Sequence, residues 1–303
     1  MELPDLSGKT VLITGANSGI GFEAARAFAG KSAEVVLACR SLERAQRARE
    51  RIVAEHPSAR LELLELDLAS LGSVRAAAER FVQQEKPLHV LCNNAGVMAI
   101  PRQLTEDGFE MQLGVNHFGH FALTGLLLDA LKAADSARVV TVTSLMHRGG
   151  RLRLDDLAAE RGYHKWSAYG ASKLANLLFA FELERRLERA GLAIASLACH
   201  PGYADTDLQQ VGPRQSGSKL QQAFYRTGNL LFAQSPERGA WPTLAAATDP
   251  ALRGGELIGP GGLGALYGAP RPGRAARRAY DAELARRLWE VSEQRTGVEY
   301  RFG

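Results

Sequence analysis

The stretch Thr10-Val11-Leu12-Ile13-Thr14-Gly15-Ala16-Asn17-Ser18-Gly19-Ile20-Gly21 decides the fold of this 303-residue chain. Its first four residues form a short apolar run rich in β-branched side chains, which predicts a buried strand. The three glycines, spaced G-x-x-x-G-x-G, allow a tight turn and close approach of the backbone to a ligand. Helical apolar spacing follows from Phe22 to Ala29, so free N–H groups at the helix start would face the turn. The pattern predicts a phosphate-binding turn, with the candidate contacts Gly15, Asn17, Ser18, Gly19, Ile20 and Gly21.

Strand and helix signals alternate along the rest of the chain. Further strands are expected at residues 35–38, 61–66, 90–92, 139–142, 192–198 and 255–258. Helices are expected at residues 42–55, 74–84, 106–132 (interrupted by Gly114 and Gly119) and 167–189, and one that starts at Ser235-Pro236-Glu237. Near-continuous apolar strands separated by helices are typical of a parallel sheet covered on both faces. The sequence therefore predicts an α/β chain, residues 1–303, forming a single doubly wound, Rossmann-type domain of about seven strands.

Composition excludes several classes of function. A net charge of +4 is too small to indicate a nucleic-acid partner, and no run of about 18 apolar residues predicts a membrane span. The N-terminus leaves no room for a signal peptide, and the three cysteines lack CxxC spacing, so a cytoplasmic, reduced protein is expected. Six arginines between Arg271 and Arg287 could form a phosphate patch, but the interleaved acids favour a solvated face of a C-terminal helical extension, about residues 278–303.

The end of the second expected strand indicates which dinucleotide binds. An acidic residue there would hydrogen-bond the adenosine 2′-hydroxyl, whereas an arginine can meet a 2′-phosphate. The strand ends Ala38-Cys39-Arg40-Ser41, which favours NADP(H) over NAD(H), unless Arg40 is only a surface charge beside the next helix. Asp67, with Leu68 after it at the end of the third strand, is placed for the adenine edge.

A second motif, Tyr169-Gly170-Ala171-Ser172-Lys173, places a phenol and an ammonium four residues apart on one helix face. At roughly 4 Å and an effective dielectric of about 20, their attraction is ~4 kcal/mol, which would lower the pKa of the tyrosine. The phenol would then suit general acid/base chemistry. Tyr163 also precedes this helix, but Ser167 rather than a lysine lies four residues beyond it, so Tyr169 is the better candidate.

Taken together, these residues resemble the short-chain dehydrogenase/reductase family over essentially the whole chain. The resemblance is carried by Thr14 to Gly21, Asn93-Asn94-Ala95-Gly96, Asn116, Ser144, Tyr169-x-x-x-Lys173 and Pro201-Gly202. Within the family, Ala38-Cys39-Arg40, the run from Val115 to Phe121 and Leu288-Trp289-Glu290-Val291-Ser292 are similar to the retinol dehydrogenase and WW-domain oxidoreductase branch. No apolar N-terminal anchor and no WW module is found.

The resemblance implies an oxidoreductase that interconverts a carbonyl and an alcohol. Tyr169 would be the general acid/base, Lys173 would also hold the nicotinamide ribose, Ser144 would bind the reacting oxygen, and Asn116 would organise a water. Implied cofactor contacts are Asn94, Ala95, Gly96, Tyr169, Lys173, Pro201, Gly202 and Thr206. The alternatives are an NAD-dependent alcohol dehydrogenase and a dinucleotide-binding sensor or scaffold without turnover.

The substrate-loop region, about residues 205–235, mixes apolar side chains with Gly, Ser and Gln. This composition is typical of a lid with an apolar inner face, which would suit a lipophilic aldehyde or ketone; alternatively, those side chains pin the loop to the core. His117 and His120 have H-x-x-H spacing, but no ligand cluster accompanies them, so no metal is expected. His147 and His200 are either site contacts or ordinary buried histidines. A homo-oligomer is possible.

Overall fold

In the computed structural model, which describes residues 1–202 and 234–303, eight strands form one sheet in the order β3-β2-β1-β4-β5-β6-β7-β8. The strands are β1 (Thr10–Thr14), β2 (Glu34–Cys39), β3 (Arg60–Glu65), β4 (Val90–Asn93), β5 (Ala137–Val142), β6 (Ile194–Cys199), β7 (Leu257–Pro260) and β8 (Pro270–Gly273). The first seven are parallel, and only the β7–β8 pair is antiparallel. The doubly wound sheet is thus confirmed. Its order reverses between β1 and β4, and in such sheets ligands bind at the carboxyl ends beside the reversal.

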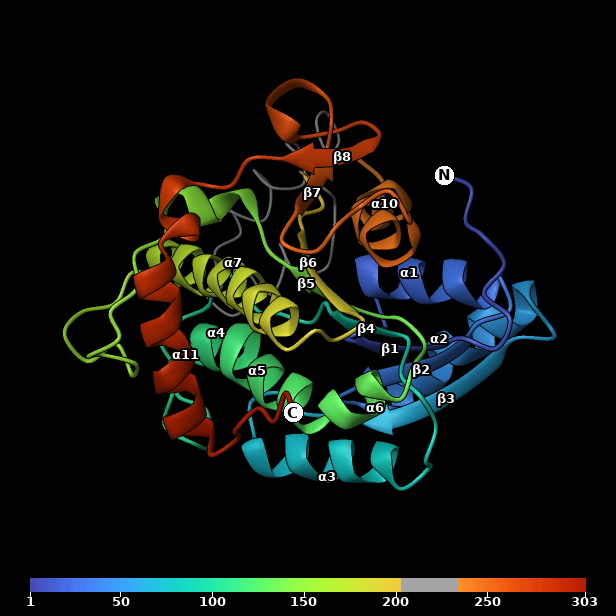
Figure 1. The fold of residues 1–303 in the computed structure, drawn as a ribbon, viewed down its shortest axis with the longest axis horizontal. Coiled ribbons are helices and arrows are strands. Elements are labelled where there is room, and N and C mark those ends of the chain that lie inside the picture. The colour runs from blue at the N-terminus through green and yellow to red at the C-terminus, as the bar shows by residue number, and fades with distance from the viewer. Residues whose placement is uncertain (203–233) are drawn as a thin grey trace.

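Helices cover both faces of this sheet (Figure 1). One face packs against α1 (Gly19–Ala29), α2 (Leu42–Glu55) and α10 (Pro236–Thr248). The other packs against α3 (Leu71–Val82), α5 (Gly119–Leu126), α6 (Leu128–Lys132) and α7 (Lys165–Arg189). The two layers follow from the strand pleat, because successive side chains point to opposite faces. Val11 and Ile13 thus join the first layer's core, and Leu12 joins the second.

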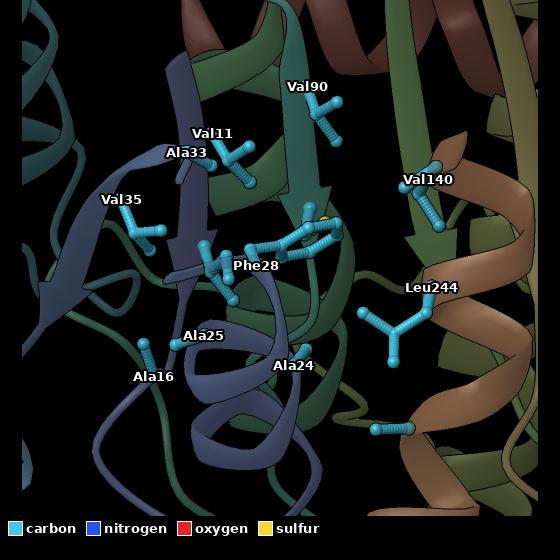
Figure 2. Packing of buried hydrophobic residues seen from close by; sticks show 14 of the residues in the cluster. Val11, Ala16, Ala24, Ala25, Phe28, Ala33, Val35, Val90, Val140 and Leu244 are labelled. Atoms are coloured by element: carbon cyan, nitrogen blue, oxygen red, sulfur yellow. The ribbon is translucent and has the colours of Figure 1, made fainter. Parts of the chain in front are cut away.

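Phe28 illustrates how α1 is fixed to the sheet. Its ring is fully buried and lies among Val11, Val90 and the small residues of α1 (Figure 2). Burying a side chain of this size contributes about 1.5–3 kcal/mol. From α10, Leu244 lies in the same cluster. The packing holds α1 against the sheet.

The expected helix over residues 106–132 is wrong in its start, but the helix type changes at the two glycines expected to interrupt it, Gly114 and Gly119. The side chain of Glu110 accepts hydrogen bonds from the N–H groups of Gln112 and Leu113, so the helix begins there as α4 (Met111–Leu113). A π-helical segment, η1 (Gly114–Phe118), follows before α5. A Cβ on Gly114 would lie 2.4 Å from Thr105 Cγ2, so the packing leaves no room for a side chain at this position. Asn116, one of the expected site residues, lies within this π-helical segment.

The C-terminal region differs from the expectation in two ways. Strand β8 was missed because Pro270-Arg271-Pro272-Gly273 lacks strand composition, and its prolines are tolerated only because it is an edge strand. The arginines do not share one helix face: Arg271 lies in β8, Arg277 in the 3₁₀ turn η4 (Arg277–Tyr280), and Arg286 in α11 (Ala282–Thr296).

The last helix, α11, packs along α7 within the same chain (Figure 1). Leu288 and Trp289 are buried, and the indole ring lies 5.0 Å from the ring of Phe121 and 5.9 Å from that of Phe179. Aromatic pairs at these separations stabilise by about 0.5–1.5 kcal/mol beyond the area they bury. In the part of the chain that the structure describes, no helix has the length and apolar composition needed to cross a membrane.

Candidate active site

The glycine-rich turn lies between β1 and α1, as the spacing predicts. Gly15 has φ +69° and Gly19 has φ +55°, a conformation that other residues rarely adopt. A Cβ on Gly21 would lie 2.5 Å from Asn94 Nδ2 and from Gly15 O, so only glycine lets α1 approach this closely. Ser18 is the N-cap of α1, yet its side chain makes no capping hydrogen bond. The N–H groups at this helix start are therefore available to an anion, and the turn fits a pyrophosphate.

Thr14 joins this turn to the loop after β4. Its hydroxyl oxygen accepts hydrogen bonds from the N–H groups of Asn94 and Ala95, both at 2.9 Å. The Asn94 side chain donates to Thr14 O at 2.8 Å. Asn94, Ala95 and Gly96, expected as cofactor contacts, thus lie beside the turn at the reversal of strand order.

The next two strands bring the residues expected at the adenosine end to the same edge of the sheet. Arg40 directly follows β2 and is exposed, with no ion pair among the described residues. Asp67 lies after β3, where its carboxylate accepts from Ala69 N at 3.0 Å. Leu68 is buried, and its carbonyl would lie 2.6 Å from a Cβ placed on Gly119. Leu68 therefore packs against the start of α5.

Ser144 and Tyr169 form the centre of the site. Ser144 ends the segment after β5 and is the N-cap of the 3₁₀ turn η2 (Leu145–Gly149). Tyr169 lies in the second turn of α7, only 4% exposed, and its phenol hydrogen-bonds the Ser144 side chain. Because α7 crosses the carboxyl end of β5, two residues 25 positions apart in sequence meet.

Lys173 lies one helical turn beyond Tyr169 and is 3% exposed. Its ammonium donates to Val142 O at 3.1 Å and lies 5.8 Å from the centre of the Tyr169 ring. Its own carbonyl accepts from Thr143 Oγ1 at 2.8 Å. The end of β5 thus fixes both the side chain and the backbone of this lysine.

Asn116 reaches the site from the π-helical segment. Its amide nitrogen donates to Val97 O at 3.0 Å and to Ser172 Oγ at 2.9 Å, and its amide oxygen accepts from Val97 N at 2.8 Å. Ser172 in turn donates to Tyr169 O. A Cβ on Gly96 would lie 3.0 Å from Asn116 Oδ1 and 3.5 Å from Lys173 Nζ, so a glycine there leaves room between the two. Sequence reasoning named Asn116 but missed Ser172, since a serine inside a helix gives no signal of its partners.

The expected lowering of the Tyr169 pKa is wrong for this structure. Burial raises the pKa of Tyr169 to about 12, against the opposing effect of the Ser144 hydrogen bond. Burial also lowers the pKa of Lys173 to about 8. Both shifts have one cause: the charged forms of phenol and ammonium lose hydration that nearby charges do not replace. The estimate at roughly 4 Å gave the attraction alone and did not include the cost of desolvation.

Tyr163 lies outside this group and makes structural hydrogen bonds. Its hydroxyl donates to Ile100 O at 2.7 Å and accepts from Gln112 Nε2 at 2.8 Å. Gln112 also accepts from Ala99 N at 2.7 Å and donates to Lys165 O at 3.0 Å. This network ties the loop after β4 to the start of α7.

Pro201 and Gly202 follow β6 at the same edge. Gly202 has φ +70°, and a Cβ on it would lie 2.3 Å from Leu266 O, so the loop between β7 and β8 packs directly against it. Gln234 donates to Pro201 O at 2.7 Å. Thr206, and nearly all of the substrate-loop region, lie outside the described residues.

The four histidines considered above are all buried. His147 Nδ1 lies 2.6 Å from Ser144 O, and its Nε2 accepts from Ala276 N at 3.1 Å, so this ring contacts the site through the backbone. His200 Nδ1 accepts from Gly202 N at 3.1 Å. Within residues 1–202 and 234–303, no group of three or more His, Cys, Asp or Glu could hold a metal ion.

Comparison with known proteins identifies the family. A family model described as short chain dehydrogenase matches residues 9–216. The chain belongs to the short-chain dehydrogenase family. Members of this family are NAD(P)-dependent oxidoreductases, and the chain is such an enzyme, interconverting carbonyl and alcohol groups. The sensor or scaffold alternative is thereby set aside.

Named relatives place it near the retinol dehydrogenases. It is 41% identical to human retinol dehydrogenase 13 over 301 residues, covering 97% of this chain and 86% of the relative. It is 42% identical to mouse polyprenol dehydrogenase over 304 residues, with 98% and 86% covered. A crystal structure of an uncharacterised protein from Mycobacterium paratuberculosis shares 42% identity and a TM-score of 0.81, covering 99% of this chain and 97% of that one.

A more distant solved structure contains the nucleotide. An NAD(P)-dependent gluconate 5-dehydrogenase from Beutenbergia cavernae, with NADP bound at low occupancy, shares 26% identity and a TM-score of 0.65. The alignment covers 84% of this chain and 95% of that one. An NAD(P) dinucleotide is thus the cofactor class of the fold.

Proposed function

We propose that the chain is an NADPH-dependent reductase of a lipophilic aldehyde or ketone, with Tyr169 as the general acid. The observation that carries the proposal is the meeting of Ser144, Tyr169, Lys173 and Asn116 beside Gly96, at the carboxyl ends of β4 and β5. These four residues come from three separate segments, and each segment is held at the site by hydrogen bonds that involve its side chains.

The chemistry of each side chain follows from its surroundings. With its pKa near 12, Tyr169 stays protonated at neutral pH and has a proton to donate to a carbonyl oxygen. The Ser144 hydroxyl, already bonded to that phenol, can hydrogen-bond the same oxygen as negative charge develops on it. A pKa near 8 leaves Lys173 mostly cationic at neutral pH, which favours proton release from its neighbour. A bound nicotinamide supplies the hydride.

The residues around the turn would hold the dinucleotide. The N-terminus of α1 and the glycines from Gly15 to Gly21 suit the pyrophosphate, and Asn94 to Gly96 line the approach to the nicotinamide half. Arg40 supports a 2′-phosphate, since it is an exposed cation directly after β2 where an acid would select NADH. Asp67 and Leu68 lie at the neighbouring strand end, in reach of an adenine.

Two features support a lipophilic substrate. Two of the relatives described above carry the names of lipophilic alcohols, retinol and polyprenol. Met146, two residues after Ser144, and Leu266, which packs against Gly202, each expose about two-fifths of their surface near the site. Exposed apolar side chains around a polar centre are typical of pockets for apolar ligands.

The test is a substrate panel run with wild-type protein and Tyr169→Phe. For aldehydes and ketones, consumption of NADPH and of NADH is followed separately; for alcohols, reduction of NADP+ and of NAD+ is followed separately. The proposal predicts a higher kcat/KM with NADPH than with NADH, faster turnover of longer apolar carbonyls, and loss of turnover in the variant. Alcohol oxidation that proceeds faster with NAD+ than with NADP+ would instead favour the NAD-dependent alcohol dehydrogenase. Ordinary turnover by Tyr169→Phe would exclude the assigned acid.

A further inference from the structure

The two histidines of the H-x-x-H pattern, His117 and His120, are both only 1% exposed, yet they face different neighbours. The ring of His117 lies 2.8 Å from Ser292 Oγ of α11 and packs among aromatic rings. The ring of His120 lies between the phosphate-binding turn and the π-helical segment, 2.8 Å from Thr14 Oγ1 and 3.1 Å from Asn116 O.

The partners of Thr14 determine which nitrogen of His120 carries the proton. The threonine oxygen already accepts from two backbone N–H groups, those of Asn94 and Ala95, so its own hydrogen must be donated. The nearest acceptor is His120 Nε2 at 2.8 Å, compared with Cys92 O at 3.3 Å. Nε2 is therefore the acceptor, and Nδ1 carries the hydrogen that is donated to Asn116 O.

This assignment produces one continuous chain of hydrogen bonds. It runs from the loop after β4 through the Thr14 hydroxyl and the imidazole ring to the backbone of Asn116. From there the Asn116 side chain continues to Ser172 and so to the carbonyl of Tyr169. This series of hydrogen bonds connects the two parts of the site. One end lies at the dinucleotide-binding turn, where Gly15 follows Thr14, and the other end lies at Tyr169, the proposed general acid.

We propose that His120 is a positioning residue that fixes the dinucleotide-binding turn against the backbone of Asn116. This inference rests on the proposed function, since it requires a dinucleotide at the turn and proton transfer near Asn116. The ring contributes through its fixed length and its two opposed hydrogen-bonding atoms, and it touches neither substrate nor cofactor.

The neutral state of the ring suits this role. Burial lowers the pKa of His120 to about 4, and the nearby Lys173 ammonium acts in the same direction. The other titratable rings on this helix face are those of His117, whose pKa burial also lowers, and Tyr300, whose hydroxyl donates to Phe121 O. A neutral imidazole supplies a donor and an acceptor without placing a second cation beside Lys173.

The experiment compares His120→Leu with His117→Leu, a matched loss of a buried imidazole from the same helix. For each, the NADPH Kd is measured by fluorescence titration, kcat and KM with one active carbonyl, and Tm by thermal unfolding. Both variants are expected to lower Tm. His120→Leu is expected to lower kcat about 10–100-fold and weaken NADPH binding several-fold, because small displacements of reacting groups are costly. His117→Leu is expected to leave kcat and Kd within about twofold.

Two further variants keep the proposal falsifiable if His120→Leu does not fold. His120→Gln retains a donor and an acceptor near the ring positions and should recover most of the lost kcat. His120→Asn is too short to reach both partners and should not recover it. The inference is overturned if His120→Leu or His120→Asn keeps wild-type kcat and Kd, or if His117→Leu loses as much activity as His120→Leu. If the wild-type protein binds neither NADPH nor NADH, the proposed function and this inference are both overturned. If the wild type is active and His120→Leu is equally active, only the inference is overturned.

Discussion

Tyr163 and Tyr169 lie at the two sides of the start of α7, and burial raises the pKa of both phenols. They differ in what surrounds the hydroxyl. That of Tyr163 is held between a backbone carbonyl and the Gln112 amide, and the nearby Glu110 carboxylate raises its pKa further. That of Tyr169 meets the Ser144 hydroxyl, one helical turn from the Lys173 ammonium. A buried phenol is therefore structural or reactive according to its partners, and not according to its pKa alone.

The largest expected effect separates the two tyrosines. Tyr169→Phe should lower kcat by about 10³-fold, because general acid catalysis contributes about 10²–10⁴-fold. Tyr163→Phe should keep most of kcat and lower the free energy of unfolding by about 1–2 kcal/mol, since it removes the hydrogen bonds of the hydroxyl to Ile100 O and to the Gln112 amide nitrogen. Steady-state kinetics and urea unfolding measure both. An equal loss of kcat in the two variants would remove the distinction.

Lys173→Met tests the part of the lysine in this difference between the two tyrosines. It should lower kcat about 10²-fold and make the protein without nucleotide more stable than the wild type. The pKa of Lys173 falls from 10.5 to about 8 on folding, so at pH 7 the folded state holds a poorly hydrated cation. Removing it should raise the free energy of unfolding by about 1–3 kcal/mol.

The sign of its pH dependence follows from proton uptake. Between pH 8 and 10.5 the unfolded chain binds more protons at this lysine than the folded chain does, so wild-type stability should rise with pH across that window. Lys173→Met should lack this rise, and its advantage should be largest below pH 8. Lys165→Met, at the start of the same helix, is the control and should change stability by no more than about 0.5 kcal/mol. A variant less stable than wild type at pH 7 would contradict the burial argument.

Arg40→Ala should affect neither phenol but should weaken NADPH binding by about 10–100-fold, with little change for NADH, because a charge-assisted contact to a phosphate is worth about 1.5–3 kcal/mol. Fluorescence titration with each nucleotide measures this. Arg47→Ala, which removes an exposed partner of Glu43 on α2, is the matched control and should leave both affinities unchanged. If Arg40→Ala weakens the binding of NADPH and of NADH equally, Arg40 is only a surface charge and does not contact the 2′-phosphate.

The smallest expected effect is on the pH profile of carbonyl reduction. The value of kcat/KM for NADPH should be constant up to about pH 8 and then fall by up to about tenfold per pH unit, as Lys173 loses its charge while Tyr169 remains protonated. Tyr163→Phe should show the same fall in kcat/KM above about pH 8. Lys173→Arg, which remains charged, should remove it. A wild-type profile that is flat to pH 9.5 would exclude Lys173 as the titrating group.

Local sequence patterns predicted those parts of the fold that local forces determine. The glycine spacing placed the turn between β1 and α1, and Ser235-Pro236 marked the start of α10, where the Ser235 side chain caps Arg238 N. Strand β8 could not be predicted, because its prolines are acceptable only at the edge of a sheet already formed. The π-helical segment was also missed, since it depends on Gly114 packing against Thr105.

By itself, the sequence determined the order of strands and helices, the glycine-rich turn and the residue types proposed for proton transfer, because these depend on neighbours within a few positions. Only the tertiary structure decided which phenol meets a serine and a lysine, how far burial outweighs their attraction, and that His120 bridges Thr14 and Asn116. Those outcomes depend on the loss of water and on contacts between segments far apart in the chain, and no local pattern encodes either.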